Sequence, residues 1–233
     1  MELTLRPSGQ RGGADHDWLR TRHTFSFADY RDPAHMGFRQ LRVINEDWIA
    51  PARGFGRHPH RDMEIVTYMI SGALEHRDSM DNTSVLRAGE VQRMSAGTGV
   101  EHSEINASRD QTAHLLQIWI HPARRGLAPS HAQRAFAVPD KLNRFRTIVS
   151  PTGEGGALRV HQDGLIHASV LERGRDLTYA LAPGRHAWLQ LVDGALDVNG
   201  TRLGAGDGAS AAGPGDIIIG AAETAEFLTF DLA

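Results

Sequence analysis

Cysteine is absent from the 233-residue sequence. This absence excludes disulfide bonds, cysteine-ligated iron–sulfur clusters, zinc–thiolate sites and a catalytic thiol, so any bound metal must take nitrogen and oxygen ligands. Long apolar runs are also absent, and none approaches the roughly 18 to 20 residues that a membrane-spanning helix needs. The sequence therefore predicts a protein that does not insert into a membrane.

An excess of charge of one sign is lacking as well. The formal net charge is -3 and the basic residues are dispersed, so the sequence carries no electrostatic footprint for nucleic acid. The first twenty residues contain charges at Glu2, Arg6 and Arg11 and lack the apolar stretch of a signal peptide. We therefore expect a cytoplasmic protein that binds no nucleic acid, with a monomer as the default oligomeric state.

Short apolar segments bounded by turn residues are what the sequence does contain. Four segments have the length and composition of strands: Leu41–Ile44, Glu64–Ile70, Leu115–Ile120 and Ala187–Val192. Glycine is frequent, with 25 residues, and turn dipeptides such as Ser71-Gly72 and Asn199-Gly200 follow several of the apolar segments. Sustained helical periodicity is hard to find. The sequence predicts an all-β sandwich or barrel.

Two parts of the sequence repeat one pattern. Gly72-Ala73-Leu74 with Ala88-Gly89-Glu90 is echoed by Gly194-Ala195-Leu196 with Ala205-Gly206-Asp207. Between the two copies, the Pro-, Arg- and Ala-rich segment His121–Arg146 lacks alternation and is interpreted as the connection between domains. We predict one barrel design used twice, with domains over residues 1–130 and 131–233.

Two pairs of side chains carry the predicted chemistry. His58 and His60 are two residues apart, as are His102 and Glu104. Positions i and i+2 of a strand share a face, so three imidazoles and a carboxylate can converge on one divalent metal inside a barrel. A His-Pro-His sequence alone is more often a loop feature, but both pairs fall in one predicted barrel. Glu64 has the same parity, so the spacing leaves it open as the carboxylate ligand.

The same segments resemble a known family. Gly54, His58, His60, Glu64 and Gly72 are similar to the first cupin motif, and Gly89, Gly97, His102 and Asn106 to the second. More narrowly, four segments resemble the pirin family, closest to bacterial pirin-like quercetin 2,3-dioxygenases: HTFSFADY (23–30), INEDW (44–48), HPHRDMEIVTY (58–68) and QRMSAGTGVEHSEIN (92–106). The resemblance implies two cupin barrels in tandem, each a jelly-roll-like double-stranded β-helix.

The resemblance also implies a metal in the N-terminal barrel, held by His58, His60, His102 and Glu104. Cupins in general use the carboxylate at the Glu64 position, whereas pirin-like proteins use the one that follows the last histidine, and we take Glu104 as the ligand. Fe(II) is the first expectation by resemblance, with Mn, Co, Ni, Cu and Zn as alternatives that these ligands accept.

The second domain is predicted to be a degenerate barrel without a metal. Laying it over the first domain without gaps, from the shared glycine turns, places Ala180 and Ala182 at the positions of His58 and His60. The same superposition places Ile219 and Ala221 at the positions of His102 and Glu104.

The activity that the resemblance implies is a metal-dependent oxygenation of a flavonol such as quercetin by O2, with ring opening and release of carbon monoxide. Glu104 is the expected proton acceptor, Glu64 the reserve base, and the aromatic residues expected near a planar substrate are Phe25, Phe27, Phe55 and Trp119. The alternative, by resemblance to the eukaryotic pirins, is a non-enzymatic, metal- and redox-sensing regulator that presents Arg124–Arg146 to a protein partner. A small-molecule-binding cupin or an isomerase ranks below both.

Overall fold

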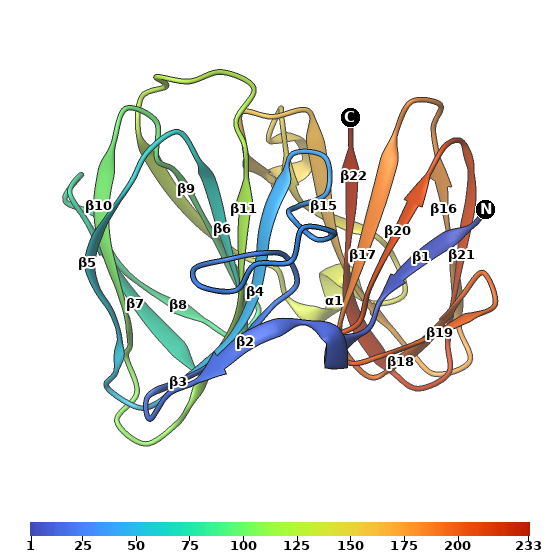
Figure 1. Ribbon diagram of the computed structural model, residues 1–233, viewed down its shortest axis with the longest axis horizontal. Helices are drawn as coiled ribbons and strands as arrows, with labels where there is room; N and C mark the ends of the chain where they lie inside the picture. Colours follow the sequence, from blue (N-terminus) through green and yellow to red (C-terminus); the bar gives the residue numbers. More distant parts are fainter. The chain divides into compact units, whose positions relative to one another are not determined.

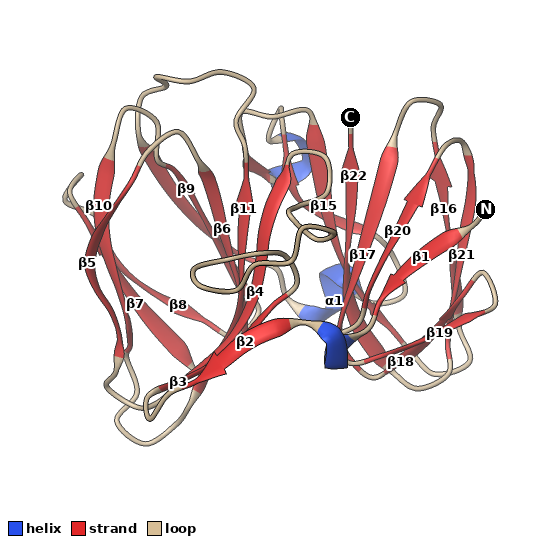
Figure 2. Ribbon diagram, viewed as in Figure 1, coloured by secondary structure: helices blue, strands red, loops and turns tan.

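The computed structural model describes residues 1–233, and its regular secondary structure is almost entirely strand (Figure 2). Helical structure is limited to α1 (Val138–Lys141) and two 3-10 turns, Ser8–Gln10 and Glu154–Gly156. None of these helices has the length and hydropathy required to cross a bilayer. The all-β prediction is confirmed, and the four predicted strands are all present.

Two compact units divide the chain. Gly12–Phe136 with Leu158–Gln162 form the first barrel, and Met1–Arg11, Ala137–Ala157 and Asp163–Ala233 form the second barrel. This division differs from the predicted cut between residues 130 and 131. The difference arises because backbone pairing, and not position in the sequence, decides which unit a strand joins.

The segment His121–Arg146 is more than the connection predicted from its composition. Strand β12 (Ser130–Ala135) lies within it and pairs antiparallel with β9 (Glu90–Ser95) of the first barrel. Its register runs without a break from Ser130 opposite Ser95 to Ala135 opposite Glu90. The side chains of this strand alternate poorly because most of them are only half-buried, and the missing alternation hid the strand from sequence analysis.

The first barrel consists of two antiparallel sheets that face each other (Figure 1). The larger sheet has the order β12-β9-β6-β11-β4-β3-β2 and the smaller one the order β5-β10-β7-β8. Besides β9 and β12, the strands are β2 (Gly12–Asp15), β3 (Leu19–His23), β4 (Leu41–Ile49), β5 (Gly54–His60), β6 (Glu64–Ser71), β7 (Ala73–Asp78), β8 (Thr83–Arg87), β10 (Val100–Asn106) and β11 (Ala113–Ile120), with β14 (Leu158–Arg159) in the same unit.

The second barrel repeats this plan. Its sheets have the orders β1-β20-β17-β22-β15-β13 and β16-β21-β18-β19. The strands are β1 (Leu3–Arg6), β13 (Arg146–Ser150), β15 (Gly164–Leu171), β16 (Asp176–Leu181), β17 (His186–Asp193), β18 (Ala195–Val198), β19 (Thr201–Gly204), β20 (Gly208–Ala212), β21 (Gly215–Ala221) and β22 (Ala225–Leu232). Each sheet of the second barrel corresponds to a sheet of the first barrel, which supports the repeat that the glycine turns predicted.

One glycine of each barrel fixes the equivalence of the two copies. Gly72 and Gly194 both adopt a left-handed backbone, with φ of 79° and 82°. A Cβ at Gly72 would lie 2.7 Å from the carbonyl oxygen of Thr112, and one at Gly194 would lie 2.2 Å from that of Thr224. Both turns therefore require glycine for conformation and for space, and they give a common origin from which matching positions can be counted.

Alternation along the strands separates an inner from an outer face. In β10 the side chains of Val100, His102, Glu104 and Asn106 are buried, whereas those between them are exposed or half-buried. One apolar cluster of the first barrel contains Leu19, Ile49, Met69, Leu74, Leu86, Ala113 and Leu115. This cluster leaves the inner positions of β5 and the middle of β10 to polar side chains, so the barrel interior is apolar in one part and polar in another.

Candidate metal centre

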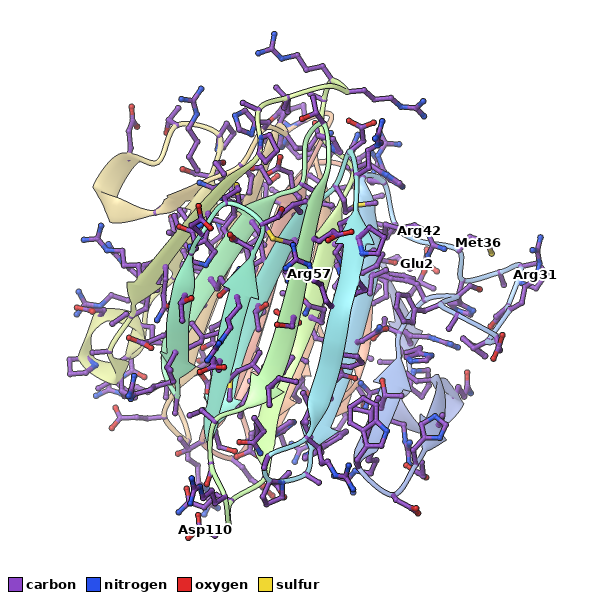
Figure 3. The ribbon with its side chains drawn as sticks, turned by 90° about the vertical axis from the view of Figure 1, so that its left-hand side faces the viewer. Glu2, Arg31, Met36, Arg42, Arg57 and Asp110 are labelled. Atoms are coloured by element: carbon purple, nitrogen blue, oxygen red, sulfur yellow. The ribbon has the colours of Figure 1, made fainter.

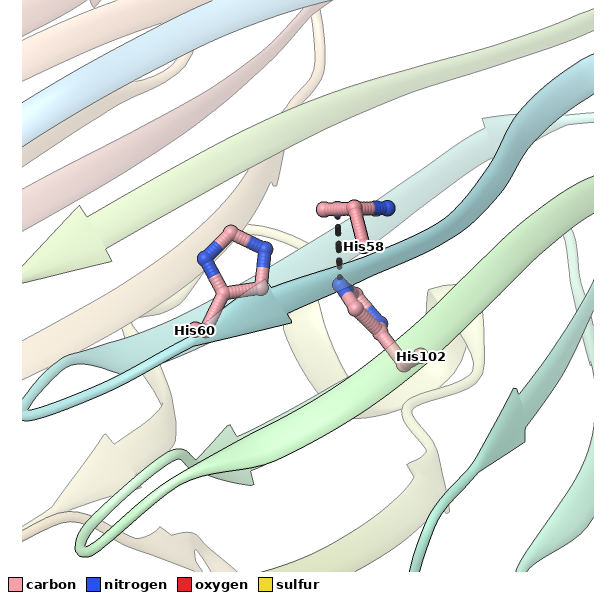
Figure 4. Close-up of side chains that lie close together, drawn as sticks. All are labelled: His58, His60 and His102. Atoms are coloured by element: carbon pink, nitrogen blue, oxygen red, sulfur yellow. Dashed lines mark hydrogen bonds between the residues drawn. The ribbon is translucent and has the colours of Figure 1, made fainter.

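Three histidines meet at one point of the first barrel. His58 and His60 come from β5, and His102 comes from the adjacent strand β10, where its Cα is opposite that of His58. The Nε2 atoms of His58 and His102 are 3.1 Å apart, and the three ring centroids lie between 4.5 and 4.9 Å from one another (Figure 4). The structure thus brings together the three histidines that the spacing singled out.

Strand alternation explains why these rings face inward. Arg57 lies on the outer face of β5 (Figure 3), where its Nε donates to Oε2 of Glu101 at 2.7 Å. His58 and His60, one and three residues further along the strand, therefore point to the opposite face. Gly54 starts the strand, and a Cβ there would lie only 2.1 Å from the carbonyl oxygen of Glu104. Glycine at this position allows β5 to approach β10 closely enough for their inward side chains to meet.

Glu104 is the candidate carboxylate ligand. Its Oε2 accepts a hydrogen bond from Nε2 of Gln117 at 2.8 Å, and its Oε1 is 3.4 Å from the hydroxyl of Thr67. A carboxylate oxygen of Glu104 lies within 4.8 Å of ring nitrogens of His102 and His76. Burial, together with the nearby carboxyl of Asp47, raises the pKa of Glu104 to about 7. A cation beside this group would offset that penalty by favouring the charged form.

The donor set fits a divalent transition metal. Burial lowers the pKa of His60 to about 4 and that of His102 to about 2, and the neighbouring imidazoles act in the same direction. Both rings are therefore neutral at physiological pH, which is the form that binds metals. Nδ1 of His58 donates to the carbonyl oxygen of Gly56 at 2.8 Å and leaves the lone pair of Nε2 facing His102. Neutral nitrogens with one carboxylate suit Fe, Mn, Co, Ni, Cu or Zn.

Glu64 lies elsewhere. It is the first residue of β6 in the larger sheet, where its Oε2 accepts from the hydroxyl of Ser95 at 2.7 Å and its Oε1 is 3.2 Å from Nδ1 of His161. Glu64 is not among the residues that line the cavity with His58 and His60. Its equal parity with the histidines was misleading, because the chain leaves β5 after His60 and turns through Asp62, with φ of 48°, before β6 begins.

A cavity of about 640 Å³ opens beside the three histidines and Glu104. Aromatic side chains form much of its wall: Trp18, Phe27, Tyr30, Phe55 and Trp119. Phe25, which was expected near a substrate, is instead a core residue with 2% of its surface exposed. A cavity of this volume with apolar walls and a few polar groups is typical of a site for a small organic ligand.

Sequence analysis missed several polar residues of this cavity. Asn45 and Asp47 lie on the inner face of β4, and Gln117 lies on β11, so all three come from the sheet opposite the histidines. Burial raises the pKa of Asp47 to about 7, although a hydrogen bond with Thr21 opposes the shift. The two-residue spacing of Asn45 and Asp47, inside the segment INEDW, was the available signal.

Apolar residues replace the metal ligands in the second barrel. Counting from Gly194, Leu196 matches Leu74, and the register of β18 with β21 then places Ile217 and Ile219 at the positions of His102 and Glu104. The pairing of β16 with β21 places Tyr179 and Leu181 at those of His58 and His60.

The gapless superposition predicted Ala180, Ala182, Ile219 and Ala221 at these positions, and it is wrong by one residue in β16 and by two in β21. The connections account for both shifts. The connection before β17 spans residues 182–185, against 61–63 in the first barrel, and the turn before β21 spans 213–214, against 96–99.

Comparisons with known proteins are consistent with a metal-binding cupin. The sequence models described as Pirin and as Quercetinase C-terminal cupin domain match residues 4–120 and 147–232. A quercetin 2,3-dioxygenase of Escherichia coli (strain K12) is 44% identical over 230 residues, which cover 99% of this chain and 98% of that protein.

Solved structures agree with the sequence matches. The bacterial pirin YhhW from Escherichia coli, in complex with nickel(II), has a TM-score of 0.95 at 44% identity and covers 99% of each chain. A quercetin 2,3-dioxygenase from Acinetobacter baumannii is 22% identical with a TM-score of 0.77, covers 99% of this chain and 85% of its own, and carries a likeness of fold alone.

Proposed function

Because the chain belongs to the pirin family, we propose that it is a metal-dependent dioxygenase that opens flavonols such as quercetin with O2 and releases carbon monoxide. The observation that carries this proposal is the cluster of His58, His60 and His102, with Glu104 beside His102, at the wall of a cavity rich in aromatic side chains. Relatives named quercetin 2,3-dioxygenase support the choice of substrate.

The cavity walls favour a planar, partly polar substrate. Phe27 and Trp119 meet edge to face with ring centroids 5.4 Å apart, and Trp119 also packs edge to face on His60 at 4.9 Å. Oδ1 of Asn45 and Nε1 of Trp119 are buried without a hydrogen-bond partner. Asp47 and Gln117 line the cavity as polar residues and could pair with hydroxyl and carbonyl groups of such a ligand.

Each site residue receives a role in this proposal. A divalent metal held by His58, His60, His102 and Glu104 supplies Lewis acidity, which stabilises the anion of a bound hydroxyl group. Glu104 accepts the hydroxyl proton on Oε1, the oxygen with the longer of its two protein contacts. Glu64, the reserve base of the sequence analysis, lacks a position on the cavity wall and is proposed to hold Ser95 and His161 in place.

We propose Fe(II) as the resident metal, because the reaction requires a metal that reacts with O2 and Zn does not change its redox state. Nickel is the strongest competitor, since a relative at 44% identity binds nickel(II). Element-resolved analysis of freshly purified protein distinguishes the two. If the purified protein holds one equivalent of another metal and neither iron nor nickel, that metal replaces both assignments.

Anaerobic reconstitution followed by addition of quercetin and O2 tests the function. We expect loss of the flavonol absorbance together with formation of carbon monoxide in equal amount. The absence of turnover with each of Fe, Mn, Co, Ni and Cu, in samples that hold one metal ion per chain, would refute the dioxygenase assignment. Metal-free protein serves as the blank because quercetin oxidises slowly by itself in air.

Two matched substitutions assign the base. Glu104→Gln is expected to lower kcat by roughly 100-fold to 10,000-fold, the range typical of a lost general base, and Glu64→Gln is expected to lower it far less. Metal content is measured in both variants, and the comparison uses samples with equal loading. A larger loss of kcat in Glu64→Gln than in Glu104→Gln would return the base role to Glu64.

A non-enzymatic regulator remains the alternative. The basic segment on which it depends is divided between the two units after Phe136, with Arg124, Arg125 and Arg134 exposed in the first barrel. A pull-down with the oxidised and the reduced metal form is the discriminating experiment. Recovery of one defined protein by only one of the two forms, from metal-loaded protein that leaves quercetin unchanged, would favour the regulator.

A further inference from the structure

Two buried residues lie behind the metal centre, on the side of His102 away from the cavity. His76 and Asp78 belong to β7, and the register places Asp78 opposite His102 and His76 opposite Glu104. The side chains of His76 and Asp78 are both 0% exposed. Nε2 of His76 is 3.0 Å from Oδ2 of Asp78, and Nδ1 of His76 is 3.5 Å from Nδ1 of His102.

The partners of His76 fix the direction of these hydrogen bonds. A carboxylate can only accept, so Nε2 of His76 carries the hydrogen that points at Asp78. The amide nitrogen of Gln92 donates to Nδ1 of His76 at 3.2 Å, which identifies Nδ1 as the acceptor of the neutral ring. With a metal bound, His102 would therefore donate its Nδ1 hydrogen to His76 and turn the lone pair on its Nε2 toward the ion that it shares with His58.

We propose that His76 and Asp78 are positioning residues for the metal centre: they select the tautomer of His102 and hold its ring so that Nε2 points at the metal. This inference rests on the metal site of the proposed function. Ligand histidines commonly donate their second ring nitrogen to a carboxylate or a carbonyl, which orients the ring and raises its basicity. His58 follows the common pattern through the carbonyl oxygen of Gly56, whereas His102 reaches a carboxylate through a second imidazole.

A different interpretation gives His76 a direct role. Ring nitrogens of His76 and His102 and a carboxylate oxygen of Glu104 lie within 4.8 Å of one another, a spacing that would also suit a second metal ion. Nε2 of His76 is engaged by Asp78, and Nδ1 is shared by Gln92 and His102, so neither nitrogen is left for a second ion. We therefore assign one ion to the chain, and the stoichiometry of metal binding separates the two interpretations.

His76→Leu and His76→Asn form the decisive pair. Leucine removes the acceptor behind His102, whereas asparagine places an amide oxygen near the position of Nδ1. His114→Leu is the matched control, because Nε2 of His114 pairs with a carboxylate oxygen of Glu46 at 2.9 Å in the same barrel without contacting a proposed ligand.

The measurements are the affinity and stoichiometry for Co(II), by competition with a chromophoric chelator, and the ligand-field absorption spectrum of the Co(II) protein. We expect one Co(II) ion per wild-type chain. His76→Leu should bind Co(II) about 10-fold to 100-fold more weakly and show a shifted spectrum. His76→Asn should recover the affinity and the spectrum, and His114→Leu should keep the wild-type values. Thermal unfolding of the metal-free variants shows that each is folded.

Several outcomes would overturn the proposal. Equal affinity and an unchanged spectrum in His76→Leu would reduce the pair to a structural contact, and two ions in the wild type with one lost in His76→Leu would make His76 a ligand. A wild-type protein that binds no metal at all would instead refute the proposed function. Metal binding of the wild type is therefore measured before any variant is compared with it. A metal-loaded wild type that leaves quercetin unchanged would refute the dioxygenase alone, and the affinity and spectrum of His76→Leu would still decide the positioning role.

Discussion

In the first barrel the inner face of β10 carries His102 and Glu104, and in the second barrel the matching positions of β21 carry Ile217 and Ile219. The strand orders around them are the same. Ile217 and Ile219 are 3% and 0% exposed within an apolar cluster that also contains Leu196, Val198 and Phe227. The fold therefore does not dictate a metal centre; a few inward side chains do, and the same scaffold closes over an apolar core when they are aliphatic.

This difference has an energetic side. Imidazoles and carboxylates lose solvation when buried, and the lowered pKa of His102 and the raised pKa of Glu104 both express that loss. Aliphatic side chains gain free energy from the same burial, about 25 cal/mol for each Å² of apolar surface removed from water. The first barrel thus gives up core stability at the positions where it gains a binding site.

The largest effect is expected from the ligands themselves. His58→Ala, His60→Ala and His102→Ala are each expected to reduce the metal content of purified protein to background, because each removes one of three converging nitrogens. His167→Ala in the second barrel is the control and should keep one equivalent. Element-resolved analysis gives the contents, and circular dichroism shows that the barrel is folded. Full metal content in all three ligand variants would remove the distinction between the barrels.

The converse change tests the second barrel. Ile217→His places an imidazole at the position that matches His102, and we expect it to lower the free energy of unfolding by about 2 to 5 kcal/mol, since it removes buried apolar contacts and buries an unpaired polar group. No gain of metal is expected, because Tyr179 and Leu181 supply no second imidazole. Urea unfolding and metal analysis are the measurements. A second equivalent of metal in this variant would show that the empty positions need only one ligand.

The smallest expected effect is a pH dependence that only the first barrel should have. Asp47 has a pKa of about 7 in the folded protein and 3.8 as the model value. The folded state therefore holds an extra proton between these values, and the stability it contributes is complete below about pH 4 and is lost as the pH rises through 7. Register matches Asp47 with the uncharged Ser169 of the second barrel.

Asp47→Asn should remove the part of this dependence that Asp47 contributes, whereas the raised pKa of Glu104 keeps its own part. For one proton the free energy of unfolding changes by at most about 1.4 kcal/mol for each pH unit. The free energy of unfolding of Asp47→Asn minus that of the wild type should therefore be larger at pH 8 than at pH 5. Urea unfolding of chelator-treated protein at several pH values measures the difference, with Asp29→Asn at the exposed cavity rim as the control. Parallel curves for wild type and Asp47→Asn would show that the Asp47 carboxyl has no raised pKa.

The convergence of the three histidines could be predicted because its signal is local. A strand alternates its side chains with a period of two, so residue spacing alone puts His58 with His60, and His102 with Glu104, on common faces. Glu64 shows the limit of the same rule, since parity has meaning only within one strand and the turn at Asp62 ends β5 before Glu64 is reached.

The second layer of the site depends on pairing between strands. His76 and Asp78 are also two residues apart, but their relation to His102 exists only through the register of β7 with β10, which spacing does not reveal. The shifted positions in the second barrel have the same origin, because connections of different length move the register by one or two residues. Strand composition is readable from sequence, whereas register requires the assembled sheet.

The pairing of β1 with β20 bears on how the protein reaches its folded state. Leu3 is opposite Ala211, so a segment made early during synthesis waits for a partner made almost last. The first barrel has no such delay, because β12 fills the matching edge beside β9 soon after that strand is complete. Sequence-distant pairing slows folding, so the metal-binding half can mature on the ribosome while the edge of the other half stays open to premature association.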